Sequence, residues 1–215
     1  MIEPDVYKQF AHDALNITGR LQSLSSLLSA HEPPSPDDIA FIKKVLDQDS
    51  QKLADSLTLF CLLGWANANP TPEVQDVDIA LLAQEAASHY LDDPRGPVVL
   101  DIGKGADTVI SNKEALQAVV QEMVKNAVRH KAQNTAVDIN LAHKDGQTTL
   151  QVRNTPHAAP PPDLTAPLSR HKESKGLGLG LALITAATPL VGAEVDIHHE
   201  GDFFTCTLAF KAPAK

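Results

Sequence analysis

The chain has 215 residues, of which 18 are Lys or Arg and 27 are Asp or Glu, so its formal charge is −9. Its 43% of hydrophobic and 21% of charged residues provide enough apolar material for a folded core, in one or two modest domains. The acidic excess argues against general binding to nucleic acid, because contact with the phosphate backbone requires a positive surface.

The cysteines and the N-terminus predict neither a disulfide-stabilised secreted protein nor a membrane protein. Cys61 and Cys206 are too few for a disulfide framework and form no CxxC pair. The N-terminus has no basic segment leading into an apolar one, and no run of about 18 apolar residues occurs anywhere. We therefore expect a soluble, cytoplasmic protein with no membrane span or membrane partner.

Two long helices are predicted at the start of the chain. Within a first helix from about Val6 to Ala30, apolar residues recur at intervals of four and three, at Phe10, Ala14, Ile17, Leu21, Leu24 and Leu28. Prolines and a Ser/Asp cluster in residues 31–38 predict a break and then the N-cap of a second helix, from about Asp38 to Leu63. The two helices form a predicted antiparallel hairpin.

The hairpin predicts a homodimer. A lone pair of helices leaves each apolar stripe half uncovered, and a second copy would complete a four-helix bundle. The alternative is that the hairpin packs on the rest of its own chain. A Pro/Asn break over residues 67–72 indicates a linker, so the predicted domains are residues 1–68 and 73–215.

The second domain is predicted to be an α/β sandwich with mixed strands, which makes the whole chain an α+β protein. The pattern predicts helices over 78–91, 113–130 and 176–191, and strands over 98–102, 136–142, 148–152, 193–199 and 203–210. Asp145-Gly146 is a hairpin turn signal. Residues 154–175, rich in proline, predict a long loop or lid.

The first group of candidate functional residues is His12-Asp13-Ala-Leu-Asn16 on the first helix. The helical period places His12 about 200° around the helix from Phe10, so its imidazole is predicted to face outward, with Asn16 one turn further on. Asp13 would hold the ring in one tautomer and raise the basicity of the attacking nitrogen. An exposed His is more often only a solvated residue.

A second group lies in Glu122-Met-Val-Lys-Asn126-Ala-Val-Arg129-His130. Glu122, Asn126 and His130 share one face of the predicted helix, while Val119, Met123 and Ala127 line the face toward the core. A carboxylate and an amide oxygen in this column suit Mg²⁺ and its triphosphate, and an ordinary polar helix face is the alternative.

The third group is Lys175-Gly176-Leu-Gly178-Leu-Gly180, which leads directly into an apolar helix. Alternate glycines let the backbone approach a phosphate closely, while successive amides and the helix N-terminus face the anion. A flexible linker would not continue into such a helix.

In this order, the three groups resemble the histidine kinases of two-component signalling over nearly the whole chain. The His12 stretch resembles the phosphoacceptor H box, Glu122 to His130 the N box of a Bergerat-type ATPase, and Gly176 to Gly180 its second glycine box. Asn154 occupies the place of the Asp that opens the first glycine box and binds the adenine amino group. Thr155-Pro156-His157 follows without the usual glycines.

The resemblance implies an ATP-dependent protein-histidine kinase that autophosphorylates on His12 and passes the phosphoryl group to an aspartate of a response regulator. Its implied catalytic residues are His12, Asp13, Asn16 and Glu122, and its implied nucleotide-binding residues are Asn126, Arg129, His130, Asn154, Lys175, Gly176, Gly178 and Gly180. Glu122 and Asn126 would hold Mg²⁺. Because only eleven residues precede His12, the input is expected from a separate sensor or upstream phosphodonor.

Two other functions stay open. A histidine phosphotransferase with a degenerate ATPase-like domain would relay phosphate between regulators through His12, which the altered first glycine box favours and the complete Glu122 and Asn126 pair disfavours. A serine kinase of the anti-sigma type, or a pure ATP-binding switch, would leave the hairpin without a role.

Overall fold

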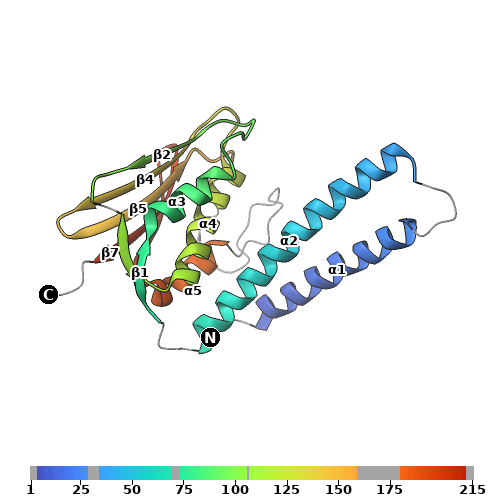
Figure 1. Ribbon diagram of the computed structural model, residues 1–215, viewed down its shortest axis with the longest axis horizontal. Coiled ribbons are helices and arrows are strands. Elements are labelled where there is room, and N and C mark those ends of the chain that lie inside the picture. The colour runs from blue at the N-terminus through green and yellow to red at the C-terminus, as the bar shows by residue number, and fades with distance from the viewer. Residues whose placement is uncertain (1–3, 29–33, 69–72, 106, 159–179, 212–215) are drawn as a thin grey trace. The chain divides into compact units, whose positions relative to one another are not determined.

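The computed structural model describes residues 4–28, 34–68, 73–105, 107–158 and 180–211. The chain divides into two compact units, Met1–Asn67 and Ala68–Lys215. Two helices, α1 (Pro4–Leu28) and α2 (Pro36–Ala68), make up the first unit (Figure 1).

An ion pair joins α1 to α2. The Arg20 guanidinium lies 2.8 Å from an Asp49 carboxylate oxygen, and Asp49 is buried. The apolar side chains of Ile17 and Leu24 on α1 and of Ile42 on α2 are also buried. The polar residue that interrupts the apolar stripe of α2 is therefore paired with a cation from the other helix.

The start of α2 follows from its capping residues. The Ser35 hydroxyl accepts a hydrogen bond from the Asp38 backbone N–H at 3.2 Å, and the Asp38 carboxylate accepts one from the Ser35 N–H at 3.0 Å. The helix begins at Pro36 and continues to Ala68, beyond the predicted end at Leu63.

Several apolar side chains of α1 and α2 are exposed to solvent. They are Leu15, Leu28, Ile39, Phe41, Leu46, Leu57 and Phe60. The sequence pattern predicts Ile39, Leu46, Leu57 and Phe60 on the apolar stripe of α2, which a lone pair of helices leaves half uncovered, and in the single chain these four side chains are exposed. One helix contributes too little surface to cover that face of its partner.

The second unit contains a five-stranded mixed sheet in the order β2-β4-β5-β7-β6. Its strands are β2 (Val98–Ile102), β4 (Val137–Lys144), β5 (Gln147–Asn154), β6 (Glu194–Glu200) and β7 (Phe203–Lys211). β2 runs parallel to β4, and the other neighbours are antiparallel. A separate antiparallel pair joins β1 (Gln75–Asp78) to β3 (Thr108–Ser111).

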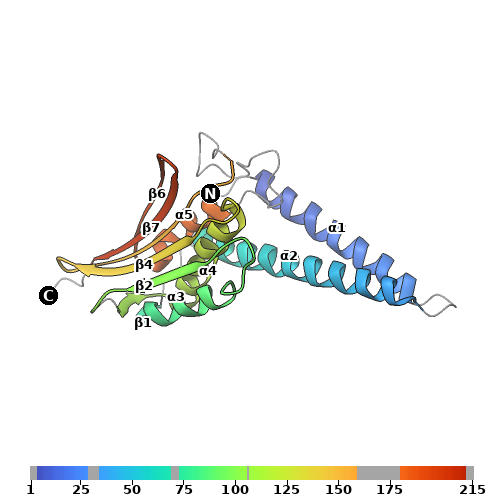
Figure 2. The same cartoon turned by 90° about the horizontal axis from the view of Figure 1, so that it is seen from above.

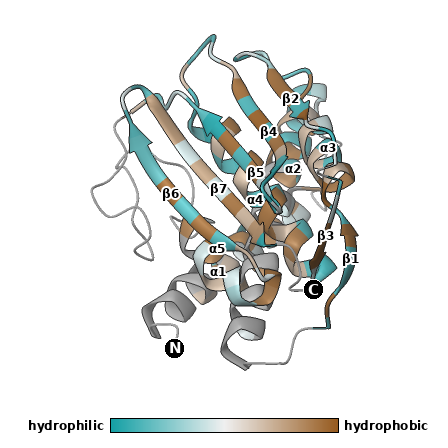
Figure 3. Ribbon diagram, turned by 90° about the vertical axis from the view of Figure 1, so that its left-hand side faces the viewer, coloured by the Kyte–Doolittle hydropathy of each residue, from teal (hydrophilic) through white to brown (hydrophobic). Residues whose placement is uncertain are grey.

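Three helices pack on one face of the large sheet: α3 (Ile79–Ser88), α4 (Lys113–His130) and α5 (Gly180–Val191) (Figure 2). Hydrophobic and hydrophilic residues alternate along β4 and β5 (Figure 3). Ile139 on β4 and Leu150 on β5 are fully buried, as are Leu116 and Met123 on α4. The core therefore lies between the sheet and α4.

Local signals explain the elements that the sequence predicted well. The Asn112 side chain caps α4 by accepting a hydrogen bond from the Ala115 N–H at 2.9 Å, and the helix has its predicted bounds. Asp145 and Gly146 have φ values of 52° and 74°, the left-handed conformation that a two-residue hairpin requires. The predicted turn is confirmed.

Two short strands were missed. β1 and β3 have four residues each, and Val77 is the only buried residue of β1. Asp78, predicted to open a helix, ends β1 and accepts a hydrogen bond from the Leu81 N–H at 2.8 Å as the N-cap of α3. α5 begins at Gly180 and ends at Val191, in agreement with an apolar helix after a glycine-rich turn, and residues 159–179 lie outside the described part of the chain.

Candidate functional site

The polar face of α4 has the predicted composition. Glu122, Asn126 and His130 are partly exposed, whereas Met123 and Ala127 are buried among the core residues. The 3.6-residue period separates the two sets, since residues four apart lie one above the other on a helix. α4 thus presents a carboxylate, an amide and an imidazole in one column.

The start of α5 lies directly against this column. A Cβ atom placed on Gly180 would lie 2.5 Å from Glu122 Oε1 and 3.0 Å from Asn126 Oδ1, and closer still to Asn126 Nδ2. Only a residue without a side chain fits there without displacing both groups. The structure therefore brings Gly180 against Glu122 and Asn126, two candidate site residues that are far from it in the sequence.

A neighbouring cation partly neutralises Glu122. Lys125 Nζ lies 3.0 Å from Glu122 Oε2, and both side chains are less than one-fifth exposed. Sequence reasoning did not single out Lys125, although the three-residue spacing of a carboxylate and an amine on a helix is a readable signal. The second oxygen of Glu122, Oε1, is the one that faces Gly180.

Three amide atoms of the site are buried without a hydrogen-bond partner among the described residues. Asn154 ends β5 and is 2% exposed, and within the described part of the chain neither its Oδ1 nor its Nδ2 has a hydrogen-bond partner. Asn126 Nδ2 is also buried and unpartnered. Because a buried polar atom without a partner costs about 1–3 kcal/mol, such atoms indicate a place where a ligand or ordered water completes the hydrogen bonding.

The C-terminal end of α4 is tied to the segment that follows Asn154. The His157 backbone N–H donates to the His130 carbonyl at 2.8 Å, and the Ala132 N–H donates to the Thr155 carbonyl at 2.7 Å. The rings of His130 and His157 are stacked, with centroids 5.9 Å apart and planes inclined by 4°. His157 was not among the predicted site residues, because its contact with α4 arises from the fold alone.

His130 is a neutral group at neutral pH. Burial, together with the charge of Arg129 and the neighbouring His157, lowers its pKa to about 4. It therefore contributes an imidazole rather than a positive charge to the face of α4. The positive charge beside it belongs to Arg129, whose carbonyl accepts a hydrogen bond from the Arg95 guanidinium at 3.5 Å.

The remaining predicted residues are described only in part. His12 and Asp13 lie within α1, but their side chains are outside the described residues, and Asn16 is exposed. Lys175, Gly176 and Gly178 are also outside them. The outward orientation of His12 and the roles of the lid residues stay predictions.

The described ranges contain neither a preformed cluster of metal-ligating side chains nor a helix able to span a membrane. They contain no group of three or more His, Cys, Asp or Glu placed to hold a metal ion. A magnesium ion at Glu122 and Asn126 would thus need further oxygen ligands from phosphate and water, as this ion often does in proteins. Among the described helices, none is long and apolar enough to cross a bilayer.

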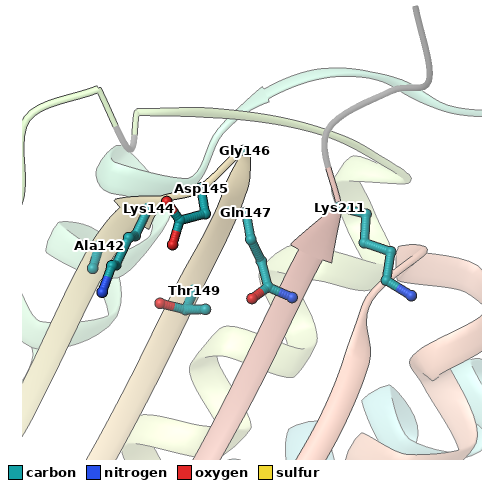
Figure 4. Close-up of a pocket in the computed structure, with 7 residues that line it drawn as sticks. All are labelled: Ala142, Lys144, Asp145, Gly146, Gln147, Thr149 and Lys211. Carbon is teal, nitrogen blue, oxygen red and sulfur yellow. The ribbon is translucent and has the colours of Figure 1, made fainter.

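A surface concavity lies elsewhere on the second unit (Figure 4). It is lined by Ala142, Lys144, Asp145, Gly146, Gln147, Thr149 and Lys211. These residues surround the β4–β5 turn, where Lys144 pairs with Gln147, whereas Asn154 pairs with Val137 at the opposite end of the same two strands. The concavity contains none of the predicted site residues.

Comparison with known proteins identifies the fold of the second unit. Residues 111–212 match the family described as histidine kinase-, DNA gyrase B-, and HSP90-like ATPases. The sensor protein CzcS of Cupriavidus metallidurans is 20% identical over 195 residues, covering 86% of this chain and 40% of CzcS. The chain therefore spans less than half the length of this curated relative.

Solved structures show the same similarity. The histidine kinase AdeS of Acinetobacter baumannii matches with a TM-score of 0.65 and 17% identity, over 94% of this chain and 96% of that one. Full-length ShkA, solved in complex with AMPPNP, matches with a TM-score of 0.70 and 15% identity, over 100% of this chain and 47% of that one. The resemblance to histidine kinases, stated above from sequence motifs, is confirmed.

Proposed function

We propose that this chain, whose residues 111–212 form a histidine kinase-like ATPase domain, is an ATP-dependent protein-histidine kinase of two-component signalling. His12 would accept the γ-phosphoryl group and pass it to an aspartate of a response regulator. The observation that carries the proposal is the apposition of Gly180 with Glu122 and Asn126, which joins two predicted nucleotide-binding segments into one site.

The residues of the second unit fit a bound Mg-ATP. The unpartnered amide atoms of Asn126 and Asn154 would be satisfied by a polar ligand, and the close packing of Gly180 against α4 holds the start of α5 beside Glu122 and Asn126. When bound, Mg-ATP supplies the phosphoryl group and the metal charge that neutralises it. Asn154 would bind the base, and Glu122 and Asn126 would hold the metal.

The charges around the site suit this role. Lys125 holds one oxygen of Glu122 and leaves the other directed toward the start of α5. Arg129, with Lys175 from the predicted lid, would neutralise phosphate charge, since phosphoryl transfer depends mainly on positioning and charge neutralisation. His130 is neutral at pH 7 and would act as a hydrogen-bonding group.

The transfer step would use the N-terminal helices. A neutral imidazole nitrogen of His12 would attack the γ-phosphorus, the new N–P bond would form as the bond to the β-phosphate oxygen breaks, and ADP would leave. Asp13 would accept a hydrogen bond from the other ring nitrogen and fix the tautomer. Asn16 would lie one helical turn away.

We propose that α1 and α2 form a hairpin that dimerises as a four-helix bundle. The exposed apolar side chains of Ile39, Leu57 and Phe60 support this proposal, because a second copy would bury them. In the same proposal, the protein acts in the cytoplasm. It receives its input from a separate sensor or upstream phosphodonor and passes the phosphoryl group to a response regulator.

The test is incubation of the purified protein with Mg²⁺ and γ-labelled ATP, beside a His12→Gln variant. We expect acid-labile, base-stable label on the wild type alone. Label that persists on His12→Gln would refute His12 as the acceptor. Absence of both label and nucleotide binding would refute the kinase and favour the phosphotransferase, which a phosphorylated regulator would then reveal by transferring its label to His12.

A further inference from the structure

Asn154 differs from the other site residues because both polar atoms of its side chain are buried and unpartnered. It lies at the end of β5, on the face of the sheet that α4 covers, and its neighbours in register are Val137 and Phe204. Neither backbone pairing nor the side chains around it fix which way the amide points. Both the Nδ2 donor and the Oδ1 acceptor of Asn154 are therefore available to a ligand.

From this arrangement we infer that Asn154 selects a purine nucleotide by two hydrogen bonds and accepts 6-amino and 6-oxo purines alike. The inference rests on the proposed function, since it specifies the nucleotide class of that site. Adenine presents a donor at N6 beside an acceptor at N1, whereas hypoxanthine presents an acceptor at O6 beside a donor at N1. One amide pairs with either edge after a half turn about its terminal bond.

The half turn exchanges Oδ1 with Nδ2 at little cost when no protein group holds either atom. If a protein partner held Oδ1 toward N6, hypoxanthine would place its O6 against Oδ1 and its N1–H against Nδ2, and both contacts would be repulsive. Because neither Oδ1 nor Nδ2 has a protein partner, the amide cannot distinguish a 6-amino purine from a 6-oxo purine. An ionised carboxylate at this position would accept hydrogen bonds but could not donate one to O6 of hypoxanthine or N1 of adenine.

The experiment compares the affinities of the full-length protein for ATP and for inosine triphosphate, measured by calorimetric titration with Mg²⁺. These nucleotides differ only at position 6 and N1, so the triphosphate contacts are unchanged. We expect dissociation constants within about threefold of each other. A preference for ATP of more than about thirtyfold would overturn the inference, because it would show that the amide is held in one orientation.

An Asn154→Leu variant tests whether the Asn154 amide forms hydrogen bonds with the purine base. Removing two hydrogen bonds, each worth roughly fivefold, should weaken both nucleotides about 25-fold. The same change should raise the melting temperature of the nucleotide-free protein by about 2–6 °C, since it replaces two unsatisfied buried atoms with apolar ones. A structural role for Asn154 predicts the opposite shift.

Asn140→Leu, at an exposed position on β4, is the matched control and should change neither affinity. Unchanged nucleotide affinities in Asn154→Leu, or a lower melting temperature, would overturn the inference and leave the kinase proposal standing. Failure of the wild type to bind either nucleotide would instead overturn the proposed function itself.

Discussion

Gly180→Ala is expected to separate nucleotide binding from folding. The added Cβ would lie 2.5 Å from Glu122 Oε1, whereas ordinary contacts begin at 3.4 Å, so a displacement of 3.4 − 2.5 = 0.9 Å is needed. The atoms that would move are the ends of side chains, Glu122 and Asn126, and not backbone. The cost therefore falls on the geometry of the site.

Losing one or two contacts to a charged triphosphate, each worth about 1.5–3 kcal/mol, lowers affinity on the order of 100-fold. We expect Gly180→Ala to weaken binding of a non-hydrolysable ATP analogue by about this factor in a calorimetric titration. Because alanine favours helix over glycine by up to about 1 kcal/mol, the melting temperature should change by only a few degrees.

Gly64→Ala is the matched control, since a Cβ at this exposed position of α2 would meet nothing within 4 Å. It should leave nucleotide affinity unchanged. The reasoning would be refuted if Gly180→Ala bound the analogue within about threefold of the wild type, or if its melting temperature fell by more than about 10 °C.

Three further predictions concern stability and assembly. Arg20→Met should lower the free energy of unfolding in urea by about 2 kcal/mol by leaving the buried Asp49 carboxylate without this cation, and Arg20→Lys should restore most of it. The pKa of His130 is about 4 in the folded protein, against an ordinary value of 6.5. As the pH drops, this imidazole therefore binds a proton in the unfolded chain before it does so in the folded one. The free energy of unfolding falls between pH 6.5 and 4 for this reason. His130→Gln should therefore lose about 1–2 kcal/mol less than the wild type between pH 7 and 4.5, and equal losses would contradict this cause. Leu57→Glu should raise the dissociation constant of the dimer at least about tenfold, as measured by sedimentation in the analytical ultracentrifuge. A wild-type protein that sediments as a monomer would contradict the proposed bundle.

The sequence predicted elements with strong local signals. α4 has its predicted bounds because Asn112 caps it, the positive charge of Arg129 suits its C-terminal end, and its apolar residues keep the helical period. β1 and β3 were missed because a four-residue strand with one or two buried residues has almost no period of its own. Such strands depend on each other for their hydrogen bonds.

The candidate site was predictable in composition but not in its contacts. The motif around Glu122 and Asn126 predicted the partly exposed face of α4, and the glycine stretch included Gly180. That these residues touch, that His157 stacks on His130, and that both amide atoms of Asn154 are orphaned depend on how β5, α4 and α5 pack. No local pattern in a single sequence encodes those distances.

The parallel pairing of β2 with β4 has a consequence for the order in which the domain assembles. β4 and β5 are joined by a two-residue turn and pair locally, whereas Val98 must find Val137 across all of α4. Hairpins close in about 1–10 μs, while non-local pairing waits for the closure of a long loop. β2 also lies at an edge of the sheet. Its amides should therefore exchange with deuterium well before those of β5, so that the strand carrying Asn154 stays paired while the edge of the sheet opens.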